Sequence, residues 1–172
     1  MQEPDTRAAD LDETDLALLE YIESDFDVNL EELSEELGLS KSAIHYRINK
    51  LRDENIIQGV SAELDPLAFG LNMMMITEVS VTHERGYAEQ IGEQLAAVDG
   101  VQRVYYTMGD VDFVVISRVQ NRDQMNELLD VIVGIDGVNE TSSRFVMQEM
   151  SPPGGTLSNM SDQMRETVLD HE

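Results

Sequence analysis

Apolar residues in the first 60 positions recur every three or four residues, the spacing of helices that bury one face. A first helix is expected after a cap at Asp12 or Thr14, with an apolar face made of Leu16, Leu19, Ile22 and Phe26. Asn29 and Glu32 have the spacing of a capping box, which predicts a second, shorter helix that ends at Leu37.

A third helix is expected over residues 41–53, where Ser40 supplies the cap and the apolar stripe consists of Ile44, Ile48 and Leu51. Gly38 can adopt the left-handed conformation that ends the second helix. Three helices, the last two joined by a short turn that contains glycine, form a helix-turn-helix arrangement. The last helix of that motif enters the major groove of DNA, so residues 41–53 are the predicted recognition helix.

After Asn55 the spacing changes from helical to the alternation of strands. A strand over 56–64 and a turn at 65–70 are expected to lead out of the first domain. Further strands are expected near 73–82, 101–107, 111–119 and 138–149, with helices over 87–98 and 125–132. The order β-α-β-β-α-β is that of a ferredoxin-like domain, so the predicted fold class is α+β. A repeat supports this order, because Val98-Asp99-Gly100-Val101 recurs as Ile135-Asp136-Gly137-Val138.

Apolar residues occupy both faces of the predicted sheet, although two helices can cover only one. One face holds Met75, Val79 and Val81. A second group of apolar residues lies on the opposite face or on a face that the sequence does not decide: Met74, Ile76, Val104, Tyr106, Val114 and Ile116. A second apolar face needs a partner, which favours dimerisation through the sheet.

These elements predict a disordered N-terminus (1–10), a helix-turn-helix domain (11–60), a connecting strand and linker (61–72), and a ferredoxin-like effector-binding and oligomerisation domain (73–150). Residues 151–172 are expected to form a linker and a short amphipathic helix, with its apolar face at Leu157, Met160, Met164 and Val168. A helix this short has only marginal stability on its own in water. It is therefore expected either to dock on its own dimer or on a neighbouring one, or to fray.

The chain is strongly acidic, with 35 Asp and Glu against 11 Lys and Arg and a net charge of −24. The window 37–52 contains no acid, yet it holds four of the bases, including both lysines. A solvated helix face is the simple alternative. The window falls on the predicted recognition helix, which favours contact with DNA phosphates and argues against an acidic mimic of DNA.

Acidity spread over the whole chain with so little lysine resembles proteins of salt-in halophiles, because at molar salt the screening length falls to about 3 Å. No apolar run is long enough to span a membrane and no signal peptide is recognisable, so a soluble cytoplasmic protein is expected. The chain has no cysteine, no glycine-rich phosphate loop and only scattered histidines. We therefore predict no enzyme activity, no cofactor and no metal site.

Two groups of residues resemble motifs of the Lrp/AsnC (feast/famine) transcriptional regulators. The helix-turn-helix motif is matched by Leu11, Asp15, Leu18, Leu19, Leu39, Ser40, Ser42, Ile44, Arg47, Ile48, Leu51, Ile57 and Gly59. The signature of the effector domain is matched by Gly109, Asp110, Asp112 and Phe113. The resemblance covers about residues 11 to 149. It implies dimers, often assembled into octamers, that bind double-stranded promoter DNA and respond to amino acids.

The sequence departs from this family in its acidity, in residues 151–172, and at Ser143-Arg144, where a threonine followed by a small residue is usual. The difference at Ser143-Arg144 concerns the identity of the ligand, and also whether this chain binds a ligand.

Side chains off the apolar stripe of the third helix are the predicted DNA contacts. Those predicted to reach base edges are Ser42, His45, Tyr46 and Asn49. Those predicted to contact phosphates are Lys41, Lys50 and Arg52, while Arg47 suits either role. The simpler alternatives are an ordinary exposed histidine at position 45 and a tyrosine at position 46 that is partly buried against the first helix.

In the second domain Gly109 allows close backbone approach and Asp112 can accept an ammonium group, and by motif position Thr141 and Ser143 add hydroxyl contacts to an effector. The alternative is a hairpin turn whose glycine and aspartates serve geometry only. The sequence thus predicts a sequence-specific DNA-binding regulator modulated by an amino acid or related small molecule. Its rivals are a small-molecule or cation sensor with vestigial DNA binding, and a DNA-compacting protein of low specificity.

Overall fold

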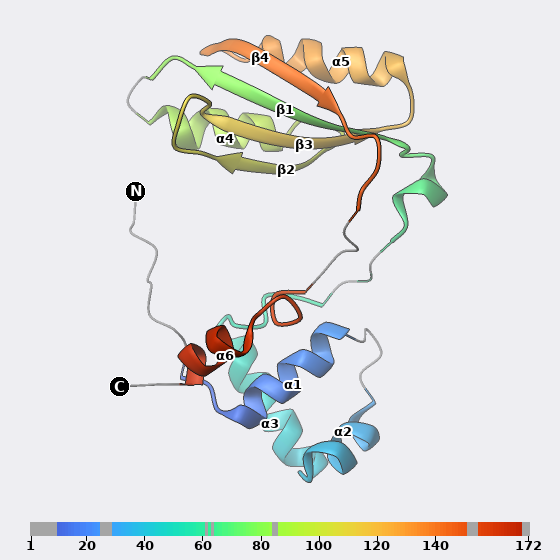
Figure 1. The fold of residues 1–172 in the computed structure, drawn as a ribbon, viewed down its shortest axis with the longest axis vertical. Coiled ribbons are helices and arrows are strands. Elements are labelled where there is room, and N and C mark those ends of the chain that lie inside the picture. Colours follow the sequence, from blue (N-terminus) through green and yellow to red (C-terminus); the bar gives the residue numbers. More distant parts are fainter. Residues whose placement is uncertain are drawn as a thin grey trace. The chain divides into compact units, whose positions relative to one another are not determined.

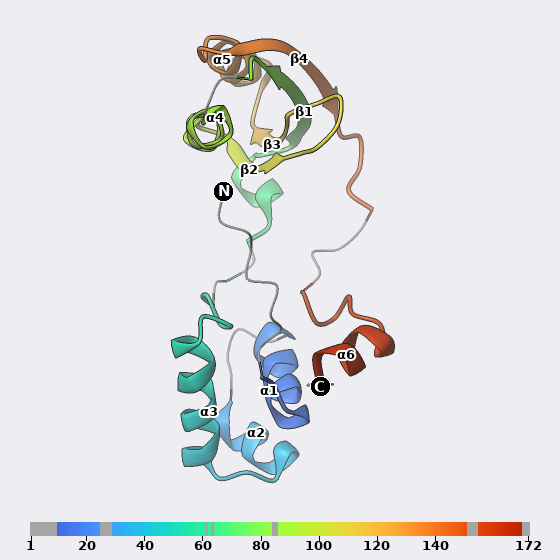
Figure 2. The same ribbon diagram turned by 90° about the vertical axis from the view of Figure 1, so that its left-hand side faces the viewer.

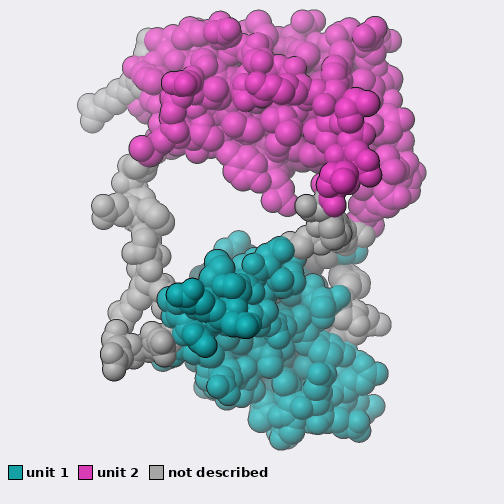
Figure 3. Space-filling view, in the orientation of Figure 1, with its two compact units in different colours: residues 1–63, 151–172 teal, residues 64–150 magenta. Residues whose placement is uncertain are grey.

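The computed structural model describes residues 10–24, 29–60, 62, 64–83, 86–150 and 155–169. The chain forms two compact units, residues 1–63 together with 151–172, and residues 64–150 (Figure 1, Figure 3). The C-terminal segment therefore belongs to the unit of the N-terminal helices, although the second unit separates them in sequence. Of the predicted disordered N-terminus, residues 1–9 lie outside the described residues, as does the 151–154 part of the linker.

Local caps define the three helices of the first unit, α1 (Glu13–Ser24), α2 (Leu30–Leu37) and α3 (Lys41–Asp53). The Asp12 carboxylate accepts the N–H of Asp15 at 2.7 Å, so Asp12 rather than Thr14 caps α1. The Asn29 side chain accepts the N–H of Glu31, and Ser40 accepts that of Ala43. Gly38, with φ 64°, provides the predicted left-handed turn. The recognition helix has the predicted bounds.

The core of this unit is formed by one buried leucine from each of α1 and α2 and by the predicted stripe of α3: Leu18, Leu33, Ile44, Ile48 and Leu51. The buried face of α1 is therefore rotated about the helix axis relative to the predicted face. Leu18 is fully buried toward α2 and α3, whereas Leu19 and Ile22 only border this core. Phe26 lies outside the described residues.

The strand predicted over residues 56–64 is wrong for the described part of that range. The N–H groups of Ile56 and Ile57 donate instead to the Leu51 carbonyl at 2.9 and 3.1 Å, and both side chains pack on the core of the first unit. Alternating residues make a strand only beside another strand, and the described residues of this unit contain none. The predicted turn at 65–70 is a short 3-10 helix, η1 (Pro66–Phe69), capped by Asp65.

The second unit contains β1 (Met73–Val81), α4 (Tyr87–Ala96), β2 (Val101–Tyr106), β3 (Phe113–Val119), α5 (Arg122–Val133) and β4 (Val138–Phe145). Its strands are antiparallel in the order β2-β3-β1-β4. This is the ferredoxin-like arrangement, so the predicted fold class is confirmed. Both helices lie on one side of the sheet (Figure 2).

The internal repeat has a structural basis. Gly100 and Gly137 follow the two helices with φ values of 89° and 94°, which favour glycine. A Cβ atom at Gly100 would lie 3.1 Å from the Arg118 carbonyl oxygen, and one at Gly137 would lie 3.0 Å from a methyl group of Ile91. Each glycine lets its helix turn closely into the next strand.

The covered face of the sheet forms the core of the second unit with side chains from α4 and α5, among them Phe113, Val115, Ile91, Leu95 and Leu128. Val104 and Tyr106 pair in register with Val115 and Phe113, so both lie on the helix-covered face. The opposite face carries half-buried apolar side chains at Met74, Ile76, Val114 and Ile116. As predicted, this second face is apolar, and the described residues of the second unit place no helix over it.

Candidate nucleic-acid interface

The outward face of α3 carries the residues predicted to contact bases. Ser42, His45 and Asn49 are exposed, and Tyr46 is 72% exposed. The alternative in which Tyr46 is partly buried against α1 is therefore wrong. Because Ile44, Ile48 and Leu51 fix the inward face of the helix, these polar side chains must point away from the core.

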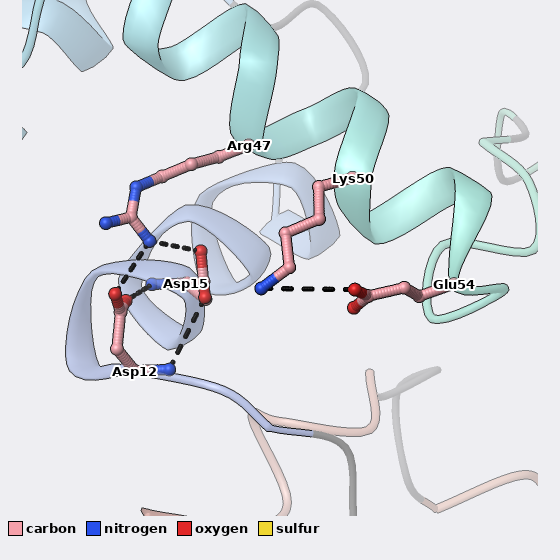
Figure 4. Close-up of polar contacts among 5 residues, drawn as sticks. All are labelled: Asp12, Asp15, Arg47, Lys50 and Glu54. Carbon is pink, nitrogen blue, oxygen red and sulfur yellow. Dashed lines mark hydrogen bonds and ion pairs between the residues drawn. The ribbon is translucent and has the colours of Figure 1, made fainter.

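Arg47 lies at the boundary between the buried and the exposed face of α3, and its side chain bonds to carboxylates at the start of α1 instead of extending into solvent. Its Nη1 atom donates to the Asp15 carboxylate at 2.6 Å and to the Asp12 carboxylate at 2.8 Å (Figure 4). The Asp15 side chain is 3% exposed, whereas that of Asp12 is half exposed. One guanidinium therefore compensates a buried carboxylate and joins the first helix to the third.

These contacts shift the pKa values of the partners. Burial opposes ionisation of Asp12, but the hydrogen bonds from Arg47 and from the N–H groups of Asp15 and Thr14 outweigh it and lower the pKa of Asp12. The same bonds to Asp12 and Asp15 raise the pKa of Arg47. A lowered carboxyl pKa stabilises the folded state above the ordinary value of 3.8, and this contribution is lost as the pH falls through the lower, folded-state pKa.

The lysines of α3 are held only by exposed acids. Lys41 pairs with Glu31 of α2. The ammonium group of Lys50 lies 4.0 Å from the carboxylate of Glu54, the residue that follows α3 (Figure 4). Arg52 is exposed and makes no ion pair within the described residues. Exposed pairs of this kind contribute about 0–1 kcal/mol, so exchanging their carboxylates for DNA phosphates costs little.

In the second unit, Asp112 is bonded within its own domain. Its carboxylate accepts the N–H of Val81 at 2.8 Å and lies 2.6 Å from Nε2 of His83, and the side chain is 13% exposed. Gly109, in the turn from β2 to β3, has a φ of 147°, which favours glycine. These contacts are also what the hairpin alternative expects.

An aromatic group lies next to this aspartate. The His83 ring stacks on Tyr87 at 4.8 Å between ring centroids, and the Tyr87 hydroxyl lies 2.7 Å from that of Tyr106. That hydrogen bond raises the pKa of Tyr87 to about 12. None of these three residues was predicted to belong to the site, because only the fold brings them beside Asp112.

Three of the four predicted effector residues, Asp112, Thr141 and Ser143, neighbour β1. The N–H of Asp112 donates to the Val79 carbonyl at 3.1 Å, while Thr141 on β4 pairs with Val79 from the other side. Ser143 pairs with Thr77, and their hydroxyl oxygens are 2.9 Å apart. Their role in binding an effector remains a prediction.

The described residues contain no helix that is both long and apolar enough to cross a membrane. Within the same part of the chain, no three His, Cys, Asp or Glu side chains gather in a way that could hold a metal ion.

A three-helix unit with an exposed polar face on its last helix, joined to an α+β unit, defines a helix-turn-helix DNA-binding protein with a second domain. Comparison with protein families agrees: residues 11–58 match the model of a winged helix-turn-helix DNA-binding domain, and residues 75–155 match the Lrp/AsnC ligand binding domain. The HTH-type transcriptional regulator FL11 of Pyrococcus horikoshii is 36% identical over 80% of this chain and 90% of its own length. The chain belongs to the Lrp/AsnC family of transcriptional regulators.

Solved structures show the same fold. A transcriptional regulator of Neisseria meningitidis in complex with L-methionine has a TM-score of 0.76 at 24% identity, covering 83% of this chain and 93% of its own. The feast or famine regulatory protein of M. tuberculosis complexed with L-methionine has a TM-score of 0.77 at 24% identity, covering 86% and 99%.

Removing the guanidinium of Arg47 should destabilise the first unit. In Arg47→Ala the Asp15 carboxylate stays buried without its partner, which we expect to cost about 3 kcal/mol. Amide hydrogen exchange in α1 and α3 of the full chain measures the loss. The matched control is Asp15→Ala/Arg47→Ala, which removes both charges and should exchange more slowly than the single variant. Exchange in Arg47→Ala as slow as in the unmodified chain would show that this ion pair contributes nothing.

Proposed function

We propose that this regulator binds specific promoter DNA through the outward face of α3. The observation that carries the proposal is an exposed polar face that holds no acid from residue 41 to residue 52, opposite a buried apolar stripe, in a chain of net charge −24. Base contacts are assigned to Ser42, His45, Tyr46 and Asn49, and phosphate contacts to Lys41, Lys50 and Arg52. Arg47 is assigned the role of positioning α3, because its guanidinium already binds two carboxylates.

The regulator is proposed to act in the cytoplasm as a dimer formed through the uncovered face of the sheet. One pair of charged groups on that face is already formed, since Arg144 makes two bonds to Glu78, at 2.6 and 3.1 Å, and lowers the pKa of that carboxyl. Paired charges beside apolar side chains are compatible with burial in an interface. A dimer would present two α3 helices to half-sites about 34 Å apart, and octamers would follow from the assembly of dimers.

An amino acid is the proposed effector. The second unit matches a family model described as a ligand binding domain, and two proteins of similar fold are complexed with L-methionine. In this chain the ligand is proposed to bind near Gly109 and Asp112, with Thr141 and Ser143 adding hydroxyls. Its effect would be to change the spacing of the paired recognition helices, which couples the two sites energetically.

The acidity of the chain is proposed to be an adaptation to concentrated potassium salt. At such concentrations the electrostatic part of DNA binding contributes little, because counterion release no longer drives it. Hydroxyl, imidazole and amide groups on α3 would then carry recognition.

Base-contacting and phosphate-contacting residues should respond differently to substitution. Asn49→Ala should reduce the preference for the chain's own promoter over an unrelated duplex by about tenfold, the size expected of one lost bidentate contact. Arg52→Ala should weaken both duplexes equally and reduce the slope of log affinity against log salt by about 0.9. Fluorescence anisotropy in potassium chloride measures both effects, with Gln90→Ala on α4 as the control.

Two results of the same titrations would contradict the proposal. Equal affinity of the unmodified chain for promoter and unrelated duplexes would favour a DNA-compacting protein. Promoter binding that is lost above about 1 M potassium chloride and returns only near about 0.1 M would contradict the adaptation to salt.

A charge on the uncovered sheet face should separate the dimer. Val114→Glu places a carboxylate on the proposed interface, between Glu78 and Tyr105 in the register of the sheet, where it would be buried beside a like charge. Sedimentation velocity should show a shift to monomer, while Gln90→Glu, which adds the same charge on the helix side, should leave the dimer intact. A dimer that survives Val114→Glu would place the interface elsewhere.

Calorimetry with L-methionine and other amino acids tests the effector site. Asp112→Ala should abolish the heat of binding, because the ammonium group of the ligand loses its acceptor. His83→Ala removes the internal partner of Asp112 but keeps the carboxylate, so it should still bind. Unchanged heats in Asp112→Ala would favour a purely structural hairpin.

A further inference from the structure

The C-terminal segment, residues 155–169, lies against α1 of the first unit (Figure 1, Figure 2). It consists of a turn followed by α6 (Asp162–Leu169), which is shorter than the helix predicted from residue 157. Residues 156–169 lie outside both family models, which end at residues 58 and 155. The contacts of this segment therefore need an explanation from this chain alone.

One carboxylate on α1 binds the turn. Glu23 accepts the N–H of Leu157 at 2.8 Å and that of Ser158 at 3.2 Å, and it also bonds the N–H of Thr156. Three successive N–H groups around one anion form a backbone nest. The approach is so close that a Cβ atom at Gly155 would overlap the Glu23 carboxylate.

A second carboxylate, one turn before Glu23 on α1, binds α6. The Arg165 guanidinium pairs with Glu20 and also donates to the Leu157 carbonyl at 2.8 Å. Arg165 thus joins α6 to α1 and to its own turn. Glu20 and Glu23 are three residues apart and share one face of α1, so the segment is held at two points.

Apolar side chains line the space between these polar contacts. A groove between α1, the residues after α3 and the C-terminal segment is lined by Leu16, Leu19, Ile22, Ile56, Ile57, Leu157, Met160 and Val168. Leu16 is 6% exposed, although it points away from the core formed with α2 and α3. Met164, predicted to share the apolar face of the tail, is 53% exposed and takes no part. The segment supplies the cover that the second apolar side of α1 requires.

We propose that residues 155–169 form a latch that holds α1 in place and, through it, positions the recognition helix of the same chain. The same α1 carries Asp12 and Asp15, which bind Arg47 of α3. By restricting the motion of α1, the latch therefore also restricts α3, because an ion pair joins the two helices. The part of the proposal that concerns DNA affinity rests on the proposed contact of α3 with promoter DNA.

The latch also changes how the two units are connected. Its sequence follows the last strand of the second unit, so that unit is inserted in the chain between two parts of the first. A change in the second unit can reach the DNA-binding unit through either connection. Release of the latch is thus a route by which an event in the second unit loosens α1.

Variants of the full chain test the latch. Glu23→Gln weakens the acceptor of three N–H groups, and Glu166→Gln, on the exposed side of α6, is a control with the same change of charge. Amide exchange in α1 should become about tenfold faster in Glu23→Gln and in a chain ending at Met150, with α4 and α5 unchanged. Promoter affinity should fall several-fold in both. Glu166→Gln should behave as the unmodified chain.

A charge swap separates the contact from general destabilisation. Glu20→Arg and Arg165→Glu should each speed exchange in α1, and the double variant should restore it. Unchanged exchange in the chain ending at Met150 would overturn the latch. Exchange that slows as protein concentration rises would overturn it too, by placing the tail on a second copy. If the unmodified chain binds no promoter DNA, the proposed function fails, while exchange in α1 still decides whether the latch exists.

Discussion

The carboxylate of Asp15, buried on α1, constrains the rest of the DNA-binding unit. A buried charge is costly unless it is paired and hydrogen-bonded, and Arg47 supplies both from α3. The pair and the apolar packing of α3 together fix the rotation of α3 against α1. With the stripe of α3 turned inward and Arg47 bound at its edge, the remaining polar side chains have only the solvent side to occupy.

The distribution of charge follows from that arrangement. Arg47 is largely used within the domain, and the two lysines lie beside acids, so α3 offers less free positive charge than its sequence suggests. What distinguishes its outer face is that residues 41–52 include no carboxylate that would repel phosphate. Hydrogen bonds of uncharged groups such as the Ser42 hydroxyl and the Asn49 amide keep their strength in strong salt, where exposed ion pairs are screened.

The sequence predicted those features that depend on neighbouring residues. The bounds of α3 follow from Ser40 and the stripe beginning at Ile44, and the order of the second unit follows from alternation and the repeated Asp-Gly turns. The prediction from sequence failed where the structure of a segment depends on contacts with residues far away in the chain. Residues 56–64 alternate but have no strand beside them, and Leu18 rather than Leu19 is buried because α2 and α3 approach α1 from that side.

The site was predictable to a similar extent. Exposure of Tyr46 and His45 follows from helical spacing, whereas the bond between Asp15 and Arg47 joins residues 32 apart and leaves no local pattern. Asp15 stands beside buried leucines on α1, and a carboxylate in that position is a signal that a cation lies opposite. The group of His83, Tyr87 and Tyr106 beside Asp112 and the contacts of Glu23 with the C-terminal turn also arise only from the fold.

The salt dependence of promoter binding by Asp15→Asn/Arg47→Gln tests most directly whether Arg47 positions α3 or contacts DNA. This pair of substitutions replaces the ion pair by two neutral amides of similar shape. If Arg47 acts within the domain, the slope of log affinity against log potassium chloride should equal that of the unmodified chain. A slope smaller by about 0.9 would show that Arg47 neutralises a phosphate and would contradict the assignment.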